Sequence, residues 1–432
     1  MKTFKGGKHV PDFKSLTENA PIEQMLVVPD YYFSLSQHIG APATPVVNVG
    51  DQVKAGQLIA QASGFVSANV YSSIAGEVVE ICDRPNAQGT LSKCIHVHTA
   101  EKQEVETLPT MKEVNKQTIL ERIALAGIVG MGGAGFPTAV KLQPRDSVDT
   151  LLINAAECEP YLNCDNRLLI EKTEEVVKGA MLMAEALGVN QIIFGIEANK
   201  PEAIECLKKH ENQAIRVDVL KTKYPQGAEK QLIYACTKRV VACGALPASV
   251  GVVVQNVSTA VAVYDAVYLK KPLYSRIVTV TCDAEVTHKN REVKIGTPVS
   301  AIIDYCNGTT EDVAKIISGG PMMGFAFADL SVATTKTDSG LLCLTKKSCD
   351  CSQPSNCINC ARCVDICPMK LEPVYIELYS NAGDLESAQK YGALNCIECG
   401  ACAYVCPAKR PLVQSIRLTK AKIRAEKAKE NK

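Results

Sequence analysis

The feature that most constrains this chain is a cysteine spacing that occurs twice near its C-terminus. Each copy reads C-x2-C-x2-C-x3-C-P, and the copies span residues 357–368 and 396–407. Such a run of thiolates followed by proline is typical of the loop that wraps a cubane [4Fe–4S] cluster. Two copies therefore predict two clusters, each able to carry single electrons. The eight predicted ligands are Cys357, Cys360, Cys363, Cys367, Cys396, Cys399, Cys402 and Cys406.

The fourth cysteine of such a run usually ligates the neighbouring cluster, because the chain turns away after the third. We therefore expect Cys406 to complete the site of the first three cysteines, and Cys367 to complete the site of the second three. A pair of structural zinc sites is the alternative, since C-x2-C is also zinc spacing. Zinc motifs usually separate two C-x2-C pairs by a longer stretch, so the pattern favours iron–sulfur clusters.

The stretch between the two runs predicts helices. Twenty-eight residues separate Cys367 from Cys396 (396 − 367 − 1). Helices are expected at 372–379 and 385–391, with an Asn-Ala-Gly break between them. We therefore expect an α-helical double-cluster ferredoxin module over 346–416, and not the compact bacterial ferredoxin, whose repeats are mostly short strands.

Composition and charge restrict the partners. The chain has 432 residues and a net charge of +1, so about three domains and no bulk electrostatic partner are expected. The basic tail 417–432 holds seven Lys/Arg and two Glu, a local charge of +5. It is either a solvated helix or a segment that touches an acidic partner or anionic lipid. The absence of Trp and an aromatic content of 5% argue against nucleic-acid binding.

The remaining cysteines and the apolar stretches bear on location. Twelve further cysteines are scattered, including Cys349 and Cys351, which we expect to be ordinary thiols. Thiols beside cluster ligands favour a reducing cytoplasm. The polar residues 1–14 do not resemble a signal peptide. The most apolar stretch, 240–254, is interrupted by glycine and proline and is too short to span a membrane.

The first third of the chain predicts strands. Residues 1–30 form an N-terminal segment, and residues 31–105 alternate short apolar runs with glycine turns. Stretches 49–58 and 72–79 resemble the two halves of a lipoyl- or biotinyl-type barrel-sandwich hybrid. Such carrier domains present a lysine at a hairpin tip, where this chain has Phe65 and Val66. We therefore expect the fold without the modification.

The centre of the chain predicts a multidomain α/β plus β protein. In residues 106–270 strands alternate with helices, which indicates an α/β layer with a mostly parallel sheet. Residues 271–345 are β-rich again and contain a glycine turn at 318–324. The expected strands lie at 150–154, 191–195, 215–220 and 276–281, and the expected helices at 167–187, 200–210 and 228–237.

A glycine-rich loop and an acidic strand end are the candidate ligand site. Residues 127–138 contain five glycines before a short helix-like stretch, and dense glycine lets backbone N–H groups approach an anion. A plain turn is the alternative, and the loop is neither a Walker loop nor a Rossmann fingerprint. Glu157 and Glu159 follow directly on the strand at 150–154, where α/β proteins bind ligands.

These motifs resemble the NADH-binding flavoprotein subunit of respiratory complex I. The matching stretches are GGAGFPT at 132–138 with Lys141, NAxExEP at 154–160, GAE at 227–229 and NVST at 256–259. The resemblance implies a Rossmann-like domain that binds FMN and NADH. It assigns a catalytic role beside the flavin–nicotinamide stack to Glu157 and a place near the NADH ribose to Glu159. The implied cofactor-binding residues are Gly130, Gly132, Gly133, Gly135, Phe136, Lys141, Asn154, Glu157, Glu159, Gly227, Glu229, Asn256 and Thr259; Phe136 is the candidate to stack on a base.

Over residues 3–416 the chain resembles more fully the RnfC family, the C subunits of the Rnf ion-translocating complex. The stretches FKGGKH at 4–9, QHIGAP at 37–42, AECEPY at 156–161 and GGPMMG at 319–324 carry this likeness. The family's domain order implies a barrel-sandwich hybrid, a flavin domain, a soluble-ligand-binding β-grasp domain at 271–345, and two clusters.

The family resemblance implies a peripheral electron-input subunit on the cytoplasmic face of the cell membrane. NADH would deliver hydride to FMN, and single electrons would pass reversibly through two [4Fe–4S] clusters to membrane and flavin-bearing subunits, with ferredoxin an indirect partner. Two alternatives stay open at this point. One is a soluble protein of this type that feeds a cytoplasmic reductase such as proline reductase; the other is a non-enzymatic cluster-bearing adaptor.

Overall fold

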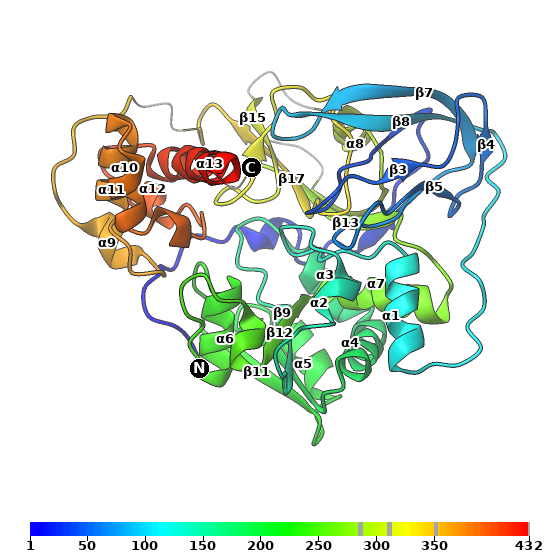
Figure 1. Cartoon of the computed structure of the whole chain (residues 1–432), viewed down its shortest axis with the longest axis horizontal. Helices are drawn as coiled ribbons and strands as arrows, with labels where there is room; N and C mark the ends of the chain where they lie inside the picture. The colour runs from blue at the N-terminus through cyan, green and yellow to red at the C-terminus, as the bar shows by residue number, and fades with distance from the viewer. Residues whose placement is uncertain (284–287, 309–312, 350–352, 431–432) are drawn as a thin grey trace.

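The computed structural model describes residues 1–283, 288–308, 313–349 and 353–430. Figure 1 places the C-terminal helices at one end of the molecule and the N-terminal strands at the other, with a sheet and its helices below both. Cys351 lies outside the described residues. No helix among the described residues is long and apolar enough to cross a membrane.

A parallel four-stranded sheet forms the centre of the α/β layer. Its strand order is β11-β10-β9-β12, and every neighbouring pair is parallel. Successive residues of β9 point to opposite faces of the sheet, and both faces are buried, which explains the continuous apolar run. The strands are β9 (Thr150–Ala155), β10 (Gln191–Glu197), β11 (Ile215–Leu220) and β12 (Val252–Asn256).

Helices cover the two faces of this sheet. Leu151 and Ile153 of β9 share a core with α1, α3, α4, α5 and α7, whereas Leu152 packs with α6 on the other face. The helices are α1 (Lys116–Leu125), α2 (Thr138–Lys141), α3 (Cys164–Glu171), α4 (Thr173–Leu187), α5 (Pro201–Lys208), α6 (Glu229–Thr237) and α7 (Val257–Tyr268), with a 3-10 turn at Pro247–Val250. The predicted α/β layer is confirmed.

The prediction of a single helix at 167–187 is wrong. The chain forms two helices there, α3 and α4, which are separated by Lys172. Its φ of −132° and ψ of 38° are not helical. Its N–H still donates to the Leu168 carbonyl, and its own carbonyl accepts from Val176. The break therefore leaves no backbone group of Lys172 unpaired, and it needs no glycine or proline that a sequence pattern could reveal.

Two small sheets form the strand-rich N-terminal unit. One has the order β2-β8-β7-β4 and the other β3-β5-β6, and all their pairs are antiparallel. The strands are β2 (Asp30–Ser34), β3 (Thr44–Pro45), β4 (Gln52–Val53), β5 (Leu58–Gln61), β6 (Val70–Tyr71), β7 (Gly76–Pro85) and β8 (Leu91–Thr99). The tip between β5 and β6 carries Phe65.

A mixed six-stranded sheet follows in the chain, with the order β1-β14-β13-β17-β15-β16. β17 lies parallel to β13 in its middle, and α8 packs its side chains against the apolar face. The elements are β1 (Ile22–Gln24), β13 (Ser275–Cys282), β14 (Lys289–Lys294), α8 (Val299–Tyr305), β15 (Val313–Ser318), β16 (Phe325–Ala326) and β17 (Gly340–Thr345).

The C-terminal module is helical, as the spacing between the cysteine runs predicted. α10 (Pro373–Ala382) ends at Gly383, whose φ of 75° is the left-handed cap that glycine adopts without strain. α11 follows directly, and the long α13 packs on both. The remaining elements are α9 (Arg362–Ile366), α11 (Leu385–Lys390), a 3-10 turn (Ala393–Asn395), α12 (Ala401–Tyr404) and α13 (Leu412–Glu430).

The N-terminal segment ties these units together, and Figure 1 shows it running between the C-terminal helices and the α/β layer. The Gly7 N–H donates to the Ile366 carbonyl in the C-terminal module. Lys8 forms an isolated antiparallel bridge with Tyr224 of the α/β layer. Because this segment also contains β1 and a 3-10 turn (Lys14–Leu16), it contacts three units of the molecule.

Candidate functional site

The glycine-rich loop lies against the carboxyl ends of the parallel strands. Asn154 of β9 and Asn256 of β12 are register partners, so their side chains begin at the same edge of the sheet. A Cβ on Gly132 would lie 3.0 Å from the Asn256 Cβ. On the other side, a Cβ on Gly227 would lie 3.2 Å from the Cys158 Sγ and 3.4 Å from the Asn154 Oδ1. We call Gly132, Asn256, Asn154 and Gly227 the glycine–asparagine cradle.

Hydrogen bonds hold the loop in place. The Met131 N–H donates to the Thr259 Oγ1 at 3.1 Å, and the buried Arg276 donates to the Met131 carbonyl at 3.3 Å. Gly132 and Gly133 are exposed, and Gly133 has a φ of 151° with no atom within 4 Å of a Cβ position. The loop thus presents bare backbone to solvent beside the cradle. Thr259, expected to hold a ligand, uses its hydroxyl to hold the loop.

The other predicted cofactor-binding residues surround this edge. The Asn154 amide donates to the Gly227 carbonyl at 2.8 Å. Lys141, at the end of α2, forms an ion pair of 2.8 Å with Glu229 at the start of α6. Phe136 is half-buried at the base of the loop, where its carbonyl accepts from the Gly130 N–H. Gly135 has a φ of 67°, which explains glycine there.

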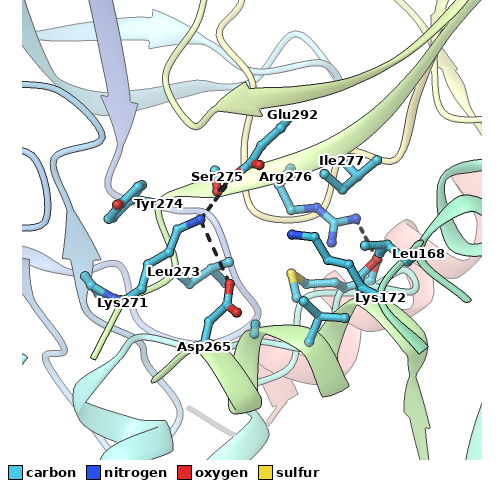
Figure 2. Close-up of a pocket in the computed structure, with 15 residues that line it drawn as sticks. Leu168, Lys172, Asp265, Lys271, Leu273, Tyr274, Ser275, Arg276, Ile277 and Glu292 are labelled. Atoms are coloured by element: carbon cyan, nitrogen blue, oxygen red, sulfur yellow. Dashed lines mark hydrogen bonds and ion pairs between the residues drawn. The ribbon is translucent and has the colours of Figure 1, made fainter. Parts of the chain in front are cut away.

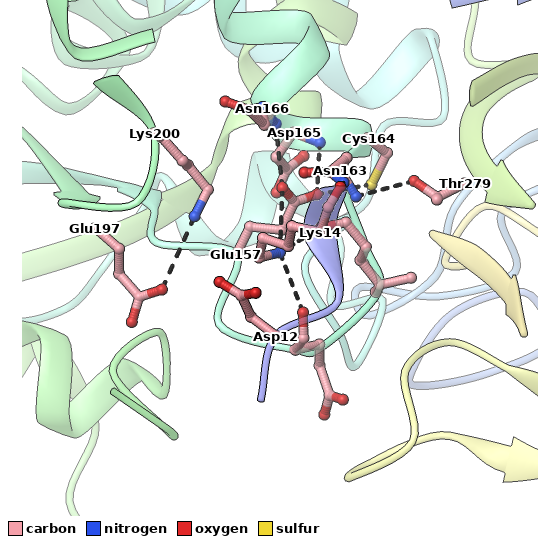
Figure 3. A network of polar contacts seen from close by, with 12 residues as sticks. Asp12, Lys14, Glu157, Asn163, Cys164, Asp165, Asn166, Glu197, Lys200 and Thr279 are labelled. Atoms are coloured by element: carbon pink, nitrogen blue, oxygen red, sulfur yellow. Dashed lines mark hydrogen bonds and ion pairs between the residues drawn. The ribbon is translucent and has the colours of Figure 1, made fainter. Parts of the chain in front are cut away.

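Glu157 caps a helix. Its carboxylate accepts the backbone N–H groups of Asp165 at 2.8 Å and Asn166 at 3.2 Å, and its side chain is only 4% exposed (Figure 3). The Lys14 ammonium lies 3.9 Å away. This places the carboxylate at the positive N-terminal end of α3. Its predicted catalytic role stays a prediction, because the geometry by itself gives Glu157 a positioning role.

That positioning role reaches the cradle through Asp165. The Asp165 carboxylate accepts from the Asn256 amide at 2.7 Å and from the Ser258 hydroxyl at 2.9 Å. Burial raises the pKa of Asp165 to about 6, and the nearby Glu157 acts in the same direction. Glu157 thus fixes the first turn of α3, and Asp165 in that turn fixes the orientation of the Asn256 side chain.

Two buried lysines at this site were not found from the sequence. The Lys14 ammonium donates to the carbonyls of Leu162 and Glu159. The Lys200 ammonium donates to the Ala156 carbonyl at 2.6 Å, and burial lowers its pKa. Isolated lysines carry no motif, so only the fold could show that both hold the acidic turn after β9.

Glu159 lies where three units meet. Its carboxylate accepts from the Met322 N–H at 3.1 Å, in the glycine turn before β16, and from the Tyr224 hydroxyl at 3.3 Å. The same hydroxyl proton is shared with the Cys399 carbonyl, which is the nearer acceptor at 2.6 Å. Burial raises the pKa of Glu159 to about 7, although these hydrogen bonds oppose the shift. Tyr224 was not predicted, and it joins the acidic turn to the second cysteine run.

A pH dependence follows from Glu159. The unfolded chain loses this proton near pH 4.5 and the folded chain near pH 7. The stabilisation is therefore complete below about pH 4.5 and is lost as the pH rises through 7. Glu159→Gln keeps a neutral side chain at every pH. The difference in unfolding free energy, variant minus parent, should therefore increase as the pH is raised. We expect an increase of about 1–2 kcal/mol from about pH 6 to about pH 8.5.

Thermal unfolding across that pH range measures this difference. The exposed Glu80→Gln serves as the matched control and should show no such trend. A Glu159→Gln difference that stays constant with pH would contradict the burial of a proton at this position.

Four of the predicted cluster ligands line one cavity in the C-terminal module. They are Cys367, Cys396, Cys399 and Cys402, and apolar side chains including Leu371, Ile397, Val413 and Ile416 complete the lining. Backbone N–H groups of Leu371 and Glu398 donate to the sulfurs of Cys367 and Cys396, each at 3.3 Å. We call this the inner thiol site.

We call the other four predicted ligands the outer thiol site. Cys357 and Cys360 are exposed, and Cys363 and Cys406 are half-buried. Burial raises the pKa of the Cys363 thiol, and the neighbouring Cys406 raises it further. Cys406 therefore lies near the first run, and Cys367 near the second. This arrangement agrees with cross-ligation of the two sites, which stays a prediction.

The residues present fit the implied groups. The inner thiol site offers four sulfurs in an apolar lining with N–H donors to sulfur, which is the environment that iron–sulfur clusters require. The glycine–asparagine cradle offers space that any side chain at Gly132 or Gly227 would fill, together with backbone donors and amides for a flavin phosphate.

A separate pocket lies behind the loop and contains none of the predicted site residues (Figure 2). Lys172, Lys271 and Arg276 face its interior beside Asp265 and Glu292. Lys271 is paired with Glu292 at 3.0 Å and with Asp265 at 3.9 Å. The pocket thus holds three cationic and two acidic side chains, and the Lys271 ion pairs join α7 to β14 across it.

Comparisons with known proteins match most of the chain. The model of the RnfC barrel sandwich hybrid domain matches residues 2–102, that of the Nuo51 FMN-binding domain residues 123–265, and that of the 4Fe-4S dicluster domain residues 356–410. The expectations of a barrel-sandwich hybrid, an FMN domain and two [4Fe–4S] clusters are confirmed at this level.

Several curated relatives cover nearly all of the chain. The C subunit of the proton-translocating ferredoxin:NAD(+) oxidoreductase complex of Clostridium ljungdahlii is 47% identical over 98% of this chain and 95% of the relative. The C subunit of the Na(+)-translocating complex of Acetobacterium woodii is 43% identical over 99% of both. The C subunit of the ion-translocating oxidoreductase complex of Rhodobacter capsulatus is 44% identical over 98% of this chain and 83% of the relative.

Among solved structures, an NAD+-reducing [NiFe]-hydrogenase in the H2-reduced state matches 71% of this chain and 62% of its own chain. It shares 18% sequence identity at a TM-score of 0.49, a likeness too distant to support an argument.

Proposed function

This chain belongs to the RnfC family, the C subunits of ion-translocating ferredoxin:NAD(+) oxidoreductase complexes, and we propose that it is the subunit that exchanges electrons with NADH. The chemistry that bound FMN supplies is the conversion of a hydride pair into single electrons, which [4Fe–4S] clusters then carry. The route is reversible, so the same residues serve NADH oxidation and NAD+ reduction.

The single observation that carries this proposal is the junction between the cradle and the inner thiol site. Cys158 lies beside Gly227 of the cradle, where its sulfur accepts the Gly227 N–H at 3.2 Å. Cys158 and Tyr224 belong to the same apolar cluster as Cys399 of the inner site. The cradle and the inner thiol site thus border the same apolar cluster, the arrangement that electron transfer between a flavin and a cluster needs.

The order of the two thiol sites follows from their exposure. The inner site packs on the α/β layer, where the Gln231 amide donates to the Pro368 carbonyl at 3.2 Å. The segment 353–361, which carries Cys357 and Cys360, is exposed along its whole length. We infer that electrons leave through the outer thiol site toward the other subunits of the complex, with ferredoxin an indirect partner.

The residue roles implied by the resemblance are part of the proposal. Asn154, Asn256 and the backbone of the glycine loop would hold the flavin and its phosphate. Glu157 and Asp165 orient Asn256 from behind, and Glu159 lies on the side of the flavin domain that meets Met322 and, through Tyr224, Cys399 of the inner thiol site.

The finer assignments of fold and place are also proposals. We infer a Rossmann-like flavin domain at 106–270 and a β-grasp, soluble-ligand-binding domain at 271–345, which the order β14-β13-β17-β15 supports. The other proposed bounds are 1–30, 31–105, 346–416 and 417–432. We infer a peripheral place on the cytoplasmic face of the membrane, with the basic end of α13 available to an acidic partner or anionic lipid.

Anaerobic reconstitution with iron, sulfide and FMN, followed by titration with NADH, tests the function. We expect the flavin absorbance to bleach first and the cluster absorbance to fall afterwards. A reconstituted protein that contains both clusters and FMN, but shows no bleaching with NADH, would be a cluster-bearing adaptor and would sink the proposal. A protein that binds zinc instead of iron and sulfide would contradict the proposed electron route.

A further inference from the structure

An aromatic side chain stands exposed at the tip of the barrel-sandwich hybrid. Phe65 is 81% exposed, and Ile39 on the adjacent loop is 48% exposed. The two loops are joined, since the Ala41 N–H donates to the Val66 carbonyl at 3.0 Å and the Ser67 hydroxyl donates to the Ala41 carbonyl at 2.8 Å. These hydrogen bonds fix the two loops to each other, so Phe65 and Ile39 are held in solvent-exposed positions.

Hydrogen bonds attach this tip to the glycine loop from two sides. On one side, the Ile39 N–H donates to the carbonyl of Gly135, two residues from the exposed Gly133. On the other side, the Asn69 amide donates to the Leu125 carbonyl at 3.0 Å, at the end of α1. Phe65 is joined to the first attachment through the Ala41–Val66 hydrogen bond and to the second through Asn69, four residues further along its own loop.

A buried lysine locks the same junction. The Lys336 ammonium donates to the carbonyl of Asn69 in the tip and, at 2.8 Å, to the carbonyl of Gly127 at the start of the glycine loop. Its backbone N–H donates to the Gln37 side chain at 3.1 Å. Lys336, which belongs to the 271–345 unit, thus joins the barrel-sandwich hybrid to the flavin domain. Contacts among these three units therefore set the position of the tip.

We propose that Phe65 forms the outer wall of the dinucleotide site and stacks on the adenine ring of NADH. This inference rests on the proposed function. Hydride transfer requires the nicotinamide to lie on the flavin inside the cradle, so the adenosine half of the molecule extends toward the exposed rim of the loop. An aromatic ring is a sequence-tolerant stacking platform for a base. The hybrid thus serves the redox site without carrying a modified lysine.

Steady-state kinetics of the flavin- and cluster-loaded protein with ferricyanide as acceptor give the first test. Phe65→Ala should raise the KM for NADH about tenfold or more while kcat changes less than about twofold. Phe65→Tyr should restore the KM, because it keeps the ring. Leu91→Ala, which removes a 67% exposed side chain at the start of β8, is the matched control and should leave the KM unchanged.

A second readout needs neither flavin nor turnover. The chain contains no Trp, so F65W introduces a single tryptophan at the tip, whose fluorescence can be excited selectively above the absorption of the tyrosines. ADP-ribose added to flavin-free F65W should quench this fluorescence, whereas L91W should show no quenching at the same ligand concentration. Ribose 5-phosphate, which lacks the base, should quench neither variant.

The outcomes separate the two proposals. A wild-type protein that reduces its flavin with NADH, together with an unchanged KM in Phe65→Ala and no quenching in F65W, overturns the role of Phe65 and leaves the function standing. If the wild type does not oxidise NADH, the proposed function is wrong. In that case the fluorescence of F65W still tests the stacking role, and absence of quenching by ADP-ribose overturns it. Loss of assembly with the membrane subunits at an unchanged KM would show that Phe65 is a protein-docking residue, which also overturns the inference.

Discussion

Cys367→Ala is expected to remove the same cluster as Cys399→Ala, although Cys367 belongs to the other cysteine run. Cys367 lines the inner thiol site with Cys399, and its sulfur accepts the Leu371 N–H within that site. Loss of one thiolate from four leaves an iron without its protein ligand, so one of the two clusters is lost. Iron and sulfide should fall to about half, and the reduced protein should show the same remaining electron paramagnetic resonance spectrum in both variants.

Cys406→Ala is the matched control for this experiment. It belongs to the second run but lies near Cys363, so its spectrum should match that of Cys357→Ala instead. If Cys367→Ala matched Cys357→Ala, each run would ligate its own cluster, and the crossed arrangement would be wrong. In either inner-site variant NADH should still bleach the flavin, while reduction of the outer cluster should become much slower, because the nearer carrier is missing.

Gly227→Val is expected to expel FMN while both clusters remain. The added Cβ would lie 3.2 Å from the Cys158 Sγ and 3.4 Å from the Asn154 Oδ1, and the two further methyl groups have to enter the cradle. Overpacking of this kind costs about 1–3 kcal/mol, which corresponds to a Kd for FMN weakened by about fivefold to about 150-fold. Fluorescence quenching of added FMN by the flavin-free protein measures this Kd.

A graded series tests the same wall of the cradle. Gly227→Ala adds only the Cβ, so its effect on the Kd should be smaller than that of Gly227→Val. Gly132→Val approaches from the opposite wall, where a Cβ would lie 3.0 Å from Asn256, and it should weaken FMN binding as well. Wild-type FMN affinity in both valine variants, with intact iron and sulfide content, would place the flavin elsewhere.

Local patterns account for much of what could be predicted from the sequence. The helices of the C-terminal module follow from apolar spacing and from the glycine break at Gly383, which acts within a few residues. The strands β9, β10 and β11 follow from short β-branched runs. The break at Lys172 could not be predicted, since its backbone groups remain hydrogen-bonded and no unusual residue marks it.

The candidate site shows the same division. Asn154 was placed at a strand end from the sequence pattern, and Gly227 was assigned to the cofactor site from the resemblance to a known family. The partners that define their surroundings were not. Lys14 meets the Glu159 carbonyl across 145 positions, and Tyr224 meets the Cys399 carbonyl across 175.

The sequence by itself determined which chemistry the chain can hold, because thiolate spacing and glycine backbone are properties of short segments. The tertiary structure alone decided how the carboxylates behave: Glu157 caps α3, whereas Glu159, two residues later, is buried with a pKa of about 7. The physical reason is that desolvation and hydrogen-bond partners depend on which distant segments enclose a group, and a one-dimensional pattern does not contain that enclosure.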